Sequence, residues 1–360
     1  MRDRTTAKSG IRLVIFGIIA FLSACSQNPW DANMGTALAQ GVANGSPRAV
    51  KVLIISMFKP EADVWIAPLA LREDVSVVGL PTNYPTVKCN AMDVCQVTTG
   101  MGHTNAAVSI SALIFSGRFD LSHTYFLVAG IAGIDPNEGT IGSATWARYL
   151  VDFGIQHEID AREMPRLWSS GYFGIHALNP DVKPDLAYKT ELFQLDEDML
   201  QWALSVSSNV RLDDNDVARA YRSHYRQEAA NRPPSVIQCD TAAGDTYWHG
   251  NALGARAEKW TALLTDAKGK YCTTQQEDNA TYEALRRGAN THLLDIRHVA
   301  VLRTGSNFDR PYAGQTAYDS LKASSGGFKA ALNNLVIAGL PLVNEIVSNW
   351  SRWETGIPSR

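Results

Sequence analysis

Two glycine-rich turns are the first places in the sequence where the backbone could hold a ligand. Residues 100–103 (Gly-Met-Gly-His) and 130–133 (Gly-Ile-Ala-Gly) each follow a short apolar run of the kind that forms a buried strand. Glycine has no side chain, so backbone N–H groups in such turns can closely approach the polar atoms of a small molecule. We therefore expect Gly102, His103 and Gly130 to contact a ligand at the carboxyl ends of the strands. A purely structural role in the turn is the alternative for His103.

Acidic, amide and aromatic side chains that could act on a ligand gather in three later segments. They are Asp245, Tyr247 and Trp248, then Glu277, Asp278 and Asn279, and finally Asn307 and Asp309. Aromatic rings offer flat faces on which a heterocyclic base can stack. An amide presents both a donor and an acceptor, and a carboxylate can bind hydroxyl groups or transfer a proton.

The order and flanks of these motifs resemble those of the nucleoside phosphorylases and related nucleosidases. Residues 98–107, 128–133, 139–144 and 148–152 are similar to successive motifs of that superfamily, and the three later segments follow in the expected order. The Gln-Glu-Asp-Asn-Ala-Thr run at residues 276–281 and the secretory start are most similar to the purine nucleoside permease group, known mainly from fungi. The resemblance covers roughly residues 50–350 and implies a purine nucleoside as the ligand.

The resemblance implies that two of the segments hold the purine. Asp245, Tyr247 and Trp248 lie in a Gly-Asp-x-aromatic segment whose aromatic side chains and backbone bind the base. Asn307 lies where the family contacts the N7 edge of the purine, and its amide suits a 6-oxopurine. Asp309 could instead deliver a proton to the leaving base. The alternatives are core packing for the two aromatic rings and a loop or capping role for Asp309.

The remaining acidic residues would act on the sugar and on the nucleophile. Glu277 lies where the family opens a helix with a glutamate that binds the ribose hydroxyls, and the uncertain register leaves Asp278 and Asn279 as candidates too. Helix capping is the alternative for this cluster. Glu61 follows the first apolar run, at the place where related hydrolases carry a glutamate that activates water. We therefore predict Glu61 as the general base for cleavage of an N-glycosidic bond, with a solvated turn as the alternative.

Two apolar residues favour water over phosphate as the nucleophile. Phosphorylases of the superfamily clamp phosphate with an arginine before the second glycine turn and a hydroxyl within it, but those places here hold Val128 and Ile131. A phosphate there would be a buried anion without charge-assisted partners, which is costly. We predict a purine nucleosidase. A phosphorylase is one alternative, since Arg303 and Arg310 could bind an anion, and a nucleoside capture or transport component without catalysis is the other.

The elements that must position these residues alternate between short apolar runs and amphipathic stretches. We expect strands at residues 52–56, 75–80, 94–98, 124–128, 236–240 and 298–303, and helices at residues 106–115, 278–289 and 329–349. This alternation predicts βαβ units, and therefore a single α/β domain with a mixed, mostly parallel central sheet flanked by helices. Residues 155–231 are polar and contain three prolines, so we expect an excursion there with one or two helices.

The amino terminus predicts export. Four basic residues precede a short apolar run that ends in Leu-Ser-Ala-Cys, which resembles a bacterial lipobox. We therefore predict lipidation of Cys25 and a periplasmic protein anchored to the outer membrane. Cleavage near residues 37–39, which would release a soluble protein, is the alternative. The expected organisation is a signal peptide over residues 1–24, a flexible tether over 25–49, the nucleoside phosphorylase-like domain over 50–350 and a tail over 351–360.

The other four cysteines predict disulfides, because their number is even and an exported protein meets an oxidising compartment. Three connectivities are possible, and the local pairing joins Cys89 to Cys95 and Cys239 to Cys272. No cysteine or histidine spacing typical of zinc sites is present, so we expect no metal, and we expect no cofactor.

Charge and hydropathy restrict the partners. The net charge of −3, with acidic and basic residues interleaved, argues against a nucleic-acid groove, which needs a basic stripe. No apolar stretch after the signal is long enough for a typical membrane span, which weighs against a carrier. We expect membrane contact only through the lipid anchor, and the resemblance implies a homo-oligomer.

Overall fold

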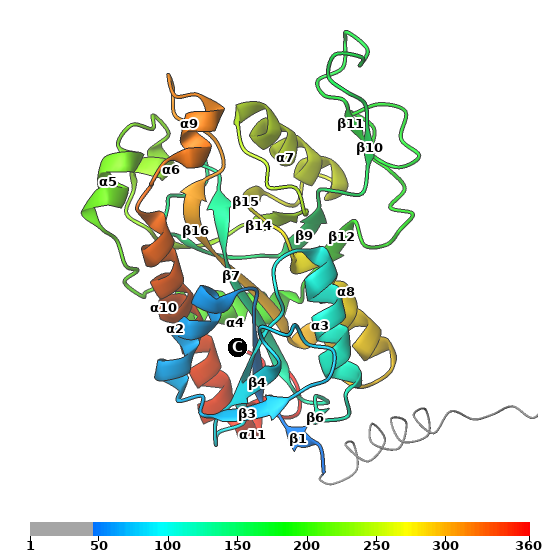
Figure 1. Ribbon diagram of the computed structural model, residues 1–360, viewed down its shortest axis with the longest axis vertical. Coiled ribbons are helices and arrows are strands. Elements are labelled where there is room, and N and C mark those ends of the chain that lie inside the picture. The colour runs from blue at the N-terminus through cyan, green and yellow to red at the C-terminus, as the bar shows by residue number, and fades with distance from the viewer. Residues whose placement is uncertain (1–45) are drawn as a thin grey trace, which may run out of the picture. The chain divides into compact units, whose positions relative to one another are not determined.

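The structure, a computed structural model, describes residues 46–360. The predicted signal peptide, the predicted lipidation site Cys25 and most of the predicted tether lie outside these residues. The described residues form one α/β unit around a sheet of 12 strands, in which parallel pairs are mixed with antiparallel ones (Figure 1). The predicted fold class is therefore confirmed.

Four long, buried strands form the centre of the sheet. β2 (Val52–Ser56) lies between β5 (Val94–Thr98) and β7 (Tyr125–Ile134). β16 (Val299–Phe308) also pairs with β7, and all of these pairs are parallel. Their side chains are buried almost throughout, as expected for strands covered on both faces. Because these strands are parallel, their carboxyl ends meet at one edge, and this edge carries the site.

Shorter strands extend the sheet on both sides. Beyond β5 lie β4 (Thr86–Cys89) and β3 (Glu73–Ser76), and beyond β7 lie β15 (Tyr271–Gln275), β14 (Asp240–Ala243), β9 (Tyr149–Asp152) and β12 (Leu192–Gln194). β8 (Ala144–Trp146) pairs with β16 and with β13 (Val236–Gln238). Two small separate sheets pair β1 (Arg48–Ala49) with β6 (Phe119–Asp120), and β10 (His157–Glu158) with β11 (Tyr172–Phe173).

Helices cover both faces of the sheet. α3 (His103–Phe115) and α8 (Asp278–Asn290) pack on one face, where Ile110 and Leu285 join the core formed by Leu53 and Val128. α2 (Lys59–Leu69), α4 (Glu197–Ser207) and α10 (Gly327–Ser348) cover the other face (Figure 1). The remaining helical elements are α5 (Asp216–Arg222), α6 (Glu228–Asn231), α7 (Asn251–Leu264), η1 (Ile296–His298), α9 (Ala317–Lys322) and α11 (Trp350–Trp353).

The excursion contains more structure than predicted. It holds three helices, α4, α5 and α6, and not one or two. α4 begins at Glu197, and the side chain of the preceding Asp196 caps it by accepting a hydrogen bond from Met199 N; the helix buries Met199, Leu200 and Ala203. These apolar residues pack with α10 in the core, so this part of the excursion belongs to the domain's main body. The position of the helix was not predicted, because its amphipathic pattern follows a long polar and proline-containing stretch.

Further segments differ from the expectations. The predicted strand at residues 236–240 is two strands, β13 and β14, which pair with different neighbours, and the helices α2 and α7 were not predicted. The predicted strand at residues 75–80 is the edge strand β3, which ends at Ser76 because Gly79, with φ of +96°, turns the chain back. The segment expected as a tail over 351–360 packs against the domain. Trp353 is fully buried, and Tyr125 Oη donates a hydrogen bond to its carbonyl oxygen over 2.8 Å.

Both disulfides follow the local pairing. Cys89 joins Cys95 across the neighbouring strands β4 and β5, with a Cα–Cα distance of 4.1 Å. Cys239 joins Cys272, which links the chain just before β14 to β15, with a Cα–Cα distance of 5.6 Å. The second disulfide lies beneath the site, because β15 contributes residues to the site wall.

Candidate active site

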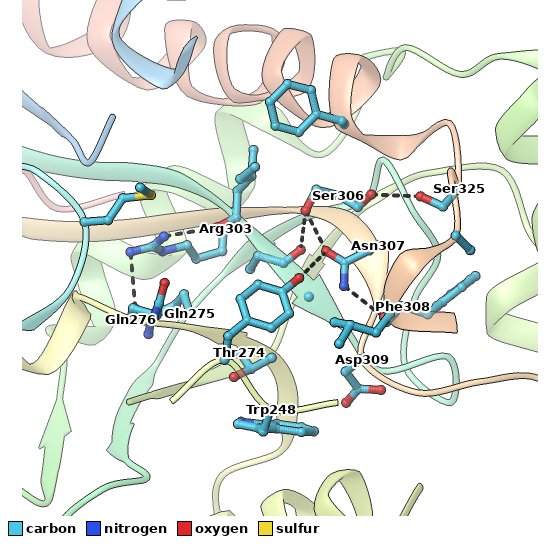
Figure 2. A pocket seen from close by; sticks show the side chains of 18 of the residues that line it. Trp248, Thr274, Gln275, Gln276, Arg303, Ser306, Asn307, Phe308, Asp309 and Ser325 are labelled. Atoms are coloured by element: carbon cyan, nitrogen blue, oxygen red, sulfur yellow. Dashed lines mark hydrogen bonds between the residues drawn. The ribbon is translucent and has the colours of Figure 1, made fainter. Parts of the chain in front are cut away.

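A cavity of about 630 Å³ opens where β2, β7, β15 and β16 end. Its volume falls within the range of about 300–1,000 Å³ that is usual for small-molecule sites. Figure 2 shows that β16 supplies a row of side chains along the cavity, from Arg303 through Ser306 and Asn307 to Phe308 and Asp309. The position agrees with the general rule that α/β sheets bind ligands at the carboxyl ends of their strands.

Glu61 lies in the wall of this cavity, in the first turn of α2. The loop after β2 leads directly into α2, and Pro60 at the start of the helix fixes the chain there. Both carboxylate oxygens are held, because Met57 N donates to Oε2 over 2.9 Å and Ile131 N donates to Oε1 over 2.7 Å. The carboxyl group thereby joins the end of β2 to residues 130–133. The prediction of a turn at residues 130–133 is wrong, because they continue strand β7 and pair with β16.

Burial sets the proton affinity of Glu61. Removal from water raises its pKa from the ordinary 4.5 to about 7, while the nearby Arg303 and the two backbone donors act in the opposite direction. A carboxyl group with this pKa exchanges protons near neutral pH, which is the requirement for a general acid or base. Gly130 is needed beside it, because a Cβ atom at that position would overlap Met57, Arg303 and Glu61.

Arg303 is the centre of a buried charge cluster. Its guanidinium lies 2.5 Å from Asp278 Oδ1 and 3.3 Å from Glu277 Oε2, and it also donates to Gln275 Oε1 over 3.3 Å. A fourth hydrogen bond, from Nη1, reaches the carbonyl oxygen of Ile131 over 3.2 Å. Three carboxyl groups, counting Glu61, therefore surround one guanidinium that is 1 % exposed. The sequence analysis treated this arginine only as a possible anion ligand.

Of the three acidic or amide candidates at the start of α8, Glu277 lines the cavity. Its Oε1 accepts a hydrogen bond from Gly102 N over 3.0 Å, so it also holds the first glycine turn. Asp278 is buried against Arg303 and is not part of the cavity wall. Asn279 points away, because its Nδ2 donates to the carbonyl oxygen of Thr190 over 2.9 Å.

Hydrogen bonds to Asp245 hold the first glycine turn, residues 100–103, in place. His103 N donates to Asp245 Oδ1 over 2.7 Å, and Gln276 Nε2 donates to the Asp245 carbonyl oxygen over 2.6 Å. Gly102, His103 and Asp245 thus position the turn, and Met101 is its residue in the cavity wall. Gly102 has φ of +90°, a conformation that favours glycine.

The aromatic and amide candidates meet on the opposite side of the cavity. Trp248 is buried beside Phe153 and lines the cavity, so it serves both the core and the wall. Tyr247 is 62 % exposed at the rim, and its hydroxyl donates to Asn307 Oδ1 over 3.4 Å. Asn307 Oδ1 also accepts from Ser306 Oγ over 2.9 Å (Figure 2). Trp248, Glu277 and Asn307 therefore line one cavity.

Asp309 reaches the cavity wall but is held in an ion-pair network. Tyr271 Oη donates to it over 2.7 Å, and Arg310 Nε donates to it over 2.7 Å. Arg310 also lies 2.9 Å from Asp135 and 2.6 Å from Glu258. With three carboxyl neighbours Arg310 is not a free anion ligand. Burial raises the pKa of Asp309 above its ordinary value, although Arg310 and Tyr271 act in the opposite direction.

Several wall residues carried no signal in the sequence. They are Met57, Phe58, Thr274, Gln275, Tyr221, Phe328, Ser320, Leu321 and residues 323–326. Most belong to elements far apart in the chain, and only the folded sheet brings them together. Within residues 46–360 no group of three or more His, Cys, Asp or Glu side chains is arranged to hold a metal ion.

Comparison with solved structures shows a shared fold. A 5′-methylthioadenosine/S-adenosylhomocysteine nucleosidase from Neisseria meningitidis superposes with a TM-score of 0.50 and 14 % identity, covering 82 % of this chain and 99 % of that one. The futalosine hydrolase of Helicobacter pylori superposes with a TM-score of 0.50 and 13 % identity, covering 82 % and 98 %. At these identities the comparison establishes the architecture, a nucleosidase-like single domain.

Sequence comparison identifies a closer group. A "Probable purine nucleoside permease" of Schizosaccharomyces pombe is 42 % identical over 315 residues, which are 84 % of this chain and 90 % of that protein. A purine nucleoside permease of Candida albicans is 38 % identical over 322 residues, which are 87 % and 79 % of the two chains. The family model described as purine nucleoside permease (NUP) matches residues 49–358. The chain therefore belongs to the purine nucleoside permease family.

Proposed function

We propose that this protein binds purine nucleosides in the cavity and cleaves their N-glycosidic bond with water. The observation that carries the proposal is Glu61, a buried carboxyl group in the cavity wall whose two oxygens are fixed by Met57 N and Ile131 N. Its pKa of about 7 suits it to take a proton from water at neutral pH. Water then attacks C1′ of the sugar and the water proton passes to Glu61. The bond from C1′ to the base breaks, and the base leaves with the bonding electron pair and takes up a proton from the solvent.

The other cavity residues have matching roles in this proposal. Glu277 faces the cavity beside Glu61 and Arg303, where its carboxylate would accept hydrogen bonds from the ribose hydroxyls. Trp248 and Tyr247 would hold the base between the wall and the rim, and Asn307 would hydrogen-bond its N7 edge. The negative charges around Glu61 and Glu277 would also stabilise the positive charge that develops on the sugar in the transition state.

The charge cluster favours water over phosphate as the nucleophile. Arg303 already has Glu277 and Asp278 as partners and Glu61 close by, so the cluster has no spare positive charge. A phosphate dianion would add two negative charges to a buried site that is already rich in carboxylates. Val128 is buried within β7 and Ile131 offers only an apolar side chain, so neither replaces the missing cation.

Capture for transport is a second candidate function, because the relatives carry the name permease. In the described part of the chain one helix, α10, is long and apolar enough to cross a membrane by length and composition. It packs against β16 and α4, and Leu335 and Ala338 are fully buried, so it is a core helix of this domain. A transport role would therefore be that of an exported binding protein, consistent with the lipobox resemblance at Cys25, which we propose as the membrane anchor.

Nucleoside turnover with and without phosphate tests the proposal. The purified full chain is incubated with inosine or adenosine, and the free base, ribose and ribose 1-phosphate are quantified by chromatography. We expect base and ribose at a rate that does not depend on phosphate. Formation of ribose 1-phosphate would establish phosphorolysis, and tight binding without any free base would establish capture.

A matched pair of variants tests the role of Glu61. Glu61→Gln should lower kcat by a factor of about 10²–10⁴, the usual contribution of a positioned general base. Glu163→Gln, at an exposed site in the excursion, should leave kcat unchanged. If Glu61→Gln keeps full turnover, the assignment of the base is wrong.

A further inference from the structure

The cavity continues beyond the residues that a nucleoside needs. We define its distal compartment by Tyr221, Phe308, Ser320, Leu321 and Ala323, all of which line the cavity. Tyr221 comes from α5, Phe308 ends β16, and the other three lie in or just after α9. The rings of Tyr221 and Phe308 lie nearly parallel with their centroids 6.5 Å apart, so the buried Phe308 supports Tyr221 from the core.

The compartment lies on the far side of Asn307 from the charged cluster. Arg303, Asn307 and Phe308 follow one another along β16, and each strand residue advances the chain by about 3.3 Å. Figure 2 shows Asn307 between Arg303 on one side and Phe308 and Ser325 on the other. A nucleoside whose ribose lies at Glu277 and whose base reaches Asn307 would therefore point the outer edge of its base toward this compartment.

The chemistry of the compartment differs from that of the rest of the cavity. Tyr221, Leu321 and Ala323 present aromatic and aliphatic surface, Phe308 is almost fully buried behind them, and none of the five residues is charged. Ser320 is buried as well. Such a space suits an uncharged, largely apolar group.

We propose that the distal compartment binds an apolar substituent on the six-membered ring of the purine, so that the preferred ligands are purine nucleosides substituted at the exocyclic nitrogen on C6. This inference rests on the proposed function, because it takes the nucleoside orientation from it. Ribose is attached to N9 on the five-membered ring, so the C6 edge is the part of the base that can extend past Asn307. The volume of about 630 Å³ agrees, because cavities of this size enclose drug-sized ligands, which are larger than a plain nucleoside.

The test compares adenosine with N6-benzyladenosine on the unmodified full chain. The measure is the ratio of their kcat/KM values, or of their dissociation constants if the nucleosides are bound without cleavage. We expect a preference of roughly 10-fold or more for the benzyl compound, as for burial of an apolar group of that size. The benzyl compound binding no better than adenosine would overturn this inference and leave the proposed function standing. Failure of both compounds to bind would overturn the proposed function as well.

Substitutions in the distal compartment test whether it causes the preference for N6-benzyladenosine over adenosine. Leu321→Trp fills the compartment and should reduce the ratio to about one or below. Leu293→Trp is the matched control, because Leu293 has the same exposed fraction of 40 % and lies outside the cavity wall. Ala323→Phe is a second filling substitution should Leu321→Trp not fold. A ratio that survives a folded filling variant would overturn the inference.

A third ligand distinguishes effects at the base from effects at the ribose. 5′-Benzylthioadenosine carries a similar ring on the ribose, away from the distal compartment. Its affinity relative to adenosine should be the same in Leu321→Trp as in the unmodified chain. An equal loss for both benzyl compounds would show that the substitution acts on the whole cavity, and would overturn the assignment to the C6 edge.

Discussion

The raised pKa of Glu61 predicts how the stability of the protein changes with pH, independently of any activity. In the folded chain the pKa is about 7, against the ordinary 4.5. Between these two values the folded state binds the proton more tightly than the unfolded state does, so stability falls as pH rises toward 7. Each pKa unit corresponds to about 1.36 kcal/mol, and the side chain is fully buried, so solvent screening does not reduce the effect.

Glu61→Gln isolates this contribution, because glutamine does not titrate. The free energy of unfolding of the unmodified chain, minus that of the variant, should fall by about 2.5 kcal/mol between about pH 5 and about pH 8. Glutamine has one oxygen for the two donors Met57 N and Ile131 N, so the variant also loses a constant amount of about 1–3 kcal/mol. That constant loss cancels when the two pH values are compared.

Urea denaturation followed by circular dichroism, with the disulfides intact, measures both free energies at each pH. Glu163→Gln serves as the control, since its exposed side chain should give the same difference at both pH values. A difference for Glu61→Gln that does not change with pH would refute the argument. A difference that grows in favour of the unmodified chain as pH rises would show that Glu61 is stabilised as the carboxylate.

Three further changes test the packing beneath the site. Arg303→Met leaves two buried carboxylates unpaired and should cost about 3–5 kcal/mol in urea denaturation; a loss below about 1 kcal/mol would contradict the ion-pair cluster. Gly130→Ala overlaps three neighbouring side chains and should weaken nucleoside binding in calorimetry and destabilise the fold by about 1–3 kcal/mol, whereas unchanged affinity would contradict the close approach. Replacing Cys239 and Cys272 by serine opens a link across 33 residues and should cost about 2–4 kcal/mol by the same denaturation assay; an unchanged midpoint would refute this.

The centre of the fold was predictable because its strands carry a local signal. The apolar runs of β2 and β5 are bounded by turn residues, and their observed limits match the predicted ones. α8 and α10 were predicted to within two residues at each end, because their apolar periodicity is strong. The excursion was less predictable, since α4 gains its place from packing against α10, a contact between segments more than a hundred residues apart.

Glu277 shows what a motif alone leaves open. Three neighbouring polar residues start α8, and their order in the sequence does not say which one faces the cavity. The structure shows which one, because Asp278 forms an ion pair with Arg303 and Asn279 donates a hydrogen bond to the carbonyl oxygen of Thr190. The spacing in the sequence therefore predicted where the cluster lies. Which of its three residues faces the cavity depends on Arg303 of the neighbouring strand β16, which pairs with Asp278.

The role of Arg303 in the choice of nucleophile was not predictable from the sequence alone. In the sequence an arginine at a strand end is as suitable for phosphate as for a carboxylate. In the fold the pairing of β16 with β7 places it between residues 130–133 of β7 and the start of α8. Its donors there are used by Glu277, Asp278, Gln275 and a carbonyl oxygen. Its charge is thereby neutralised by the carboxylates that it holds in place, so an incoming anion would have to displace one of them. An uncharged water molecule meets no such competition. Burial raises the pKa of Glu61 to about 7, where it can accept a proton, although Arg303 acts against this rise.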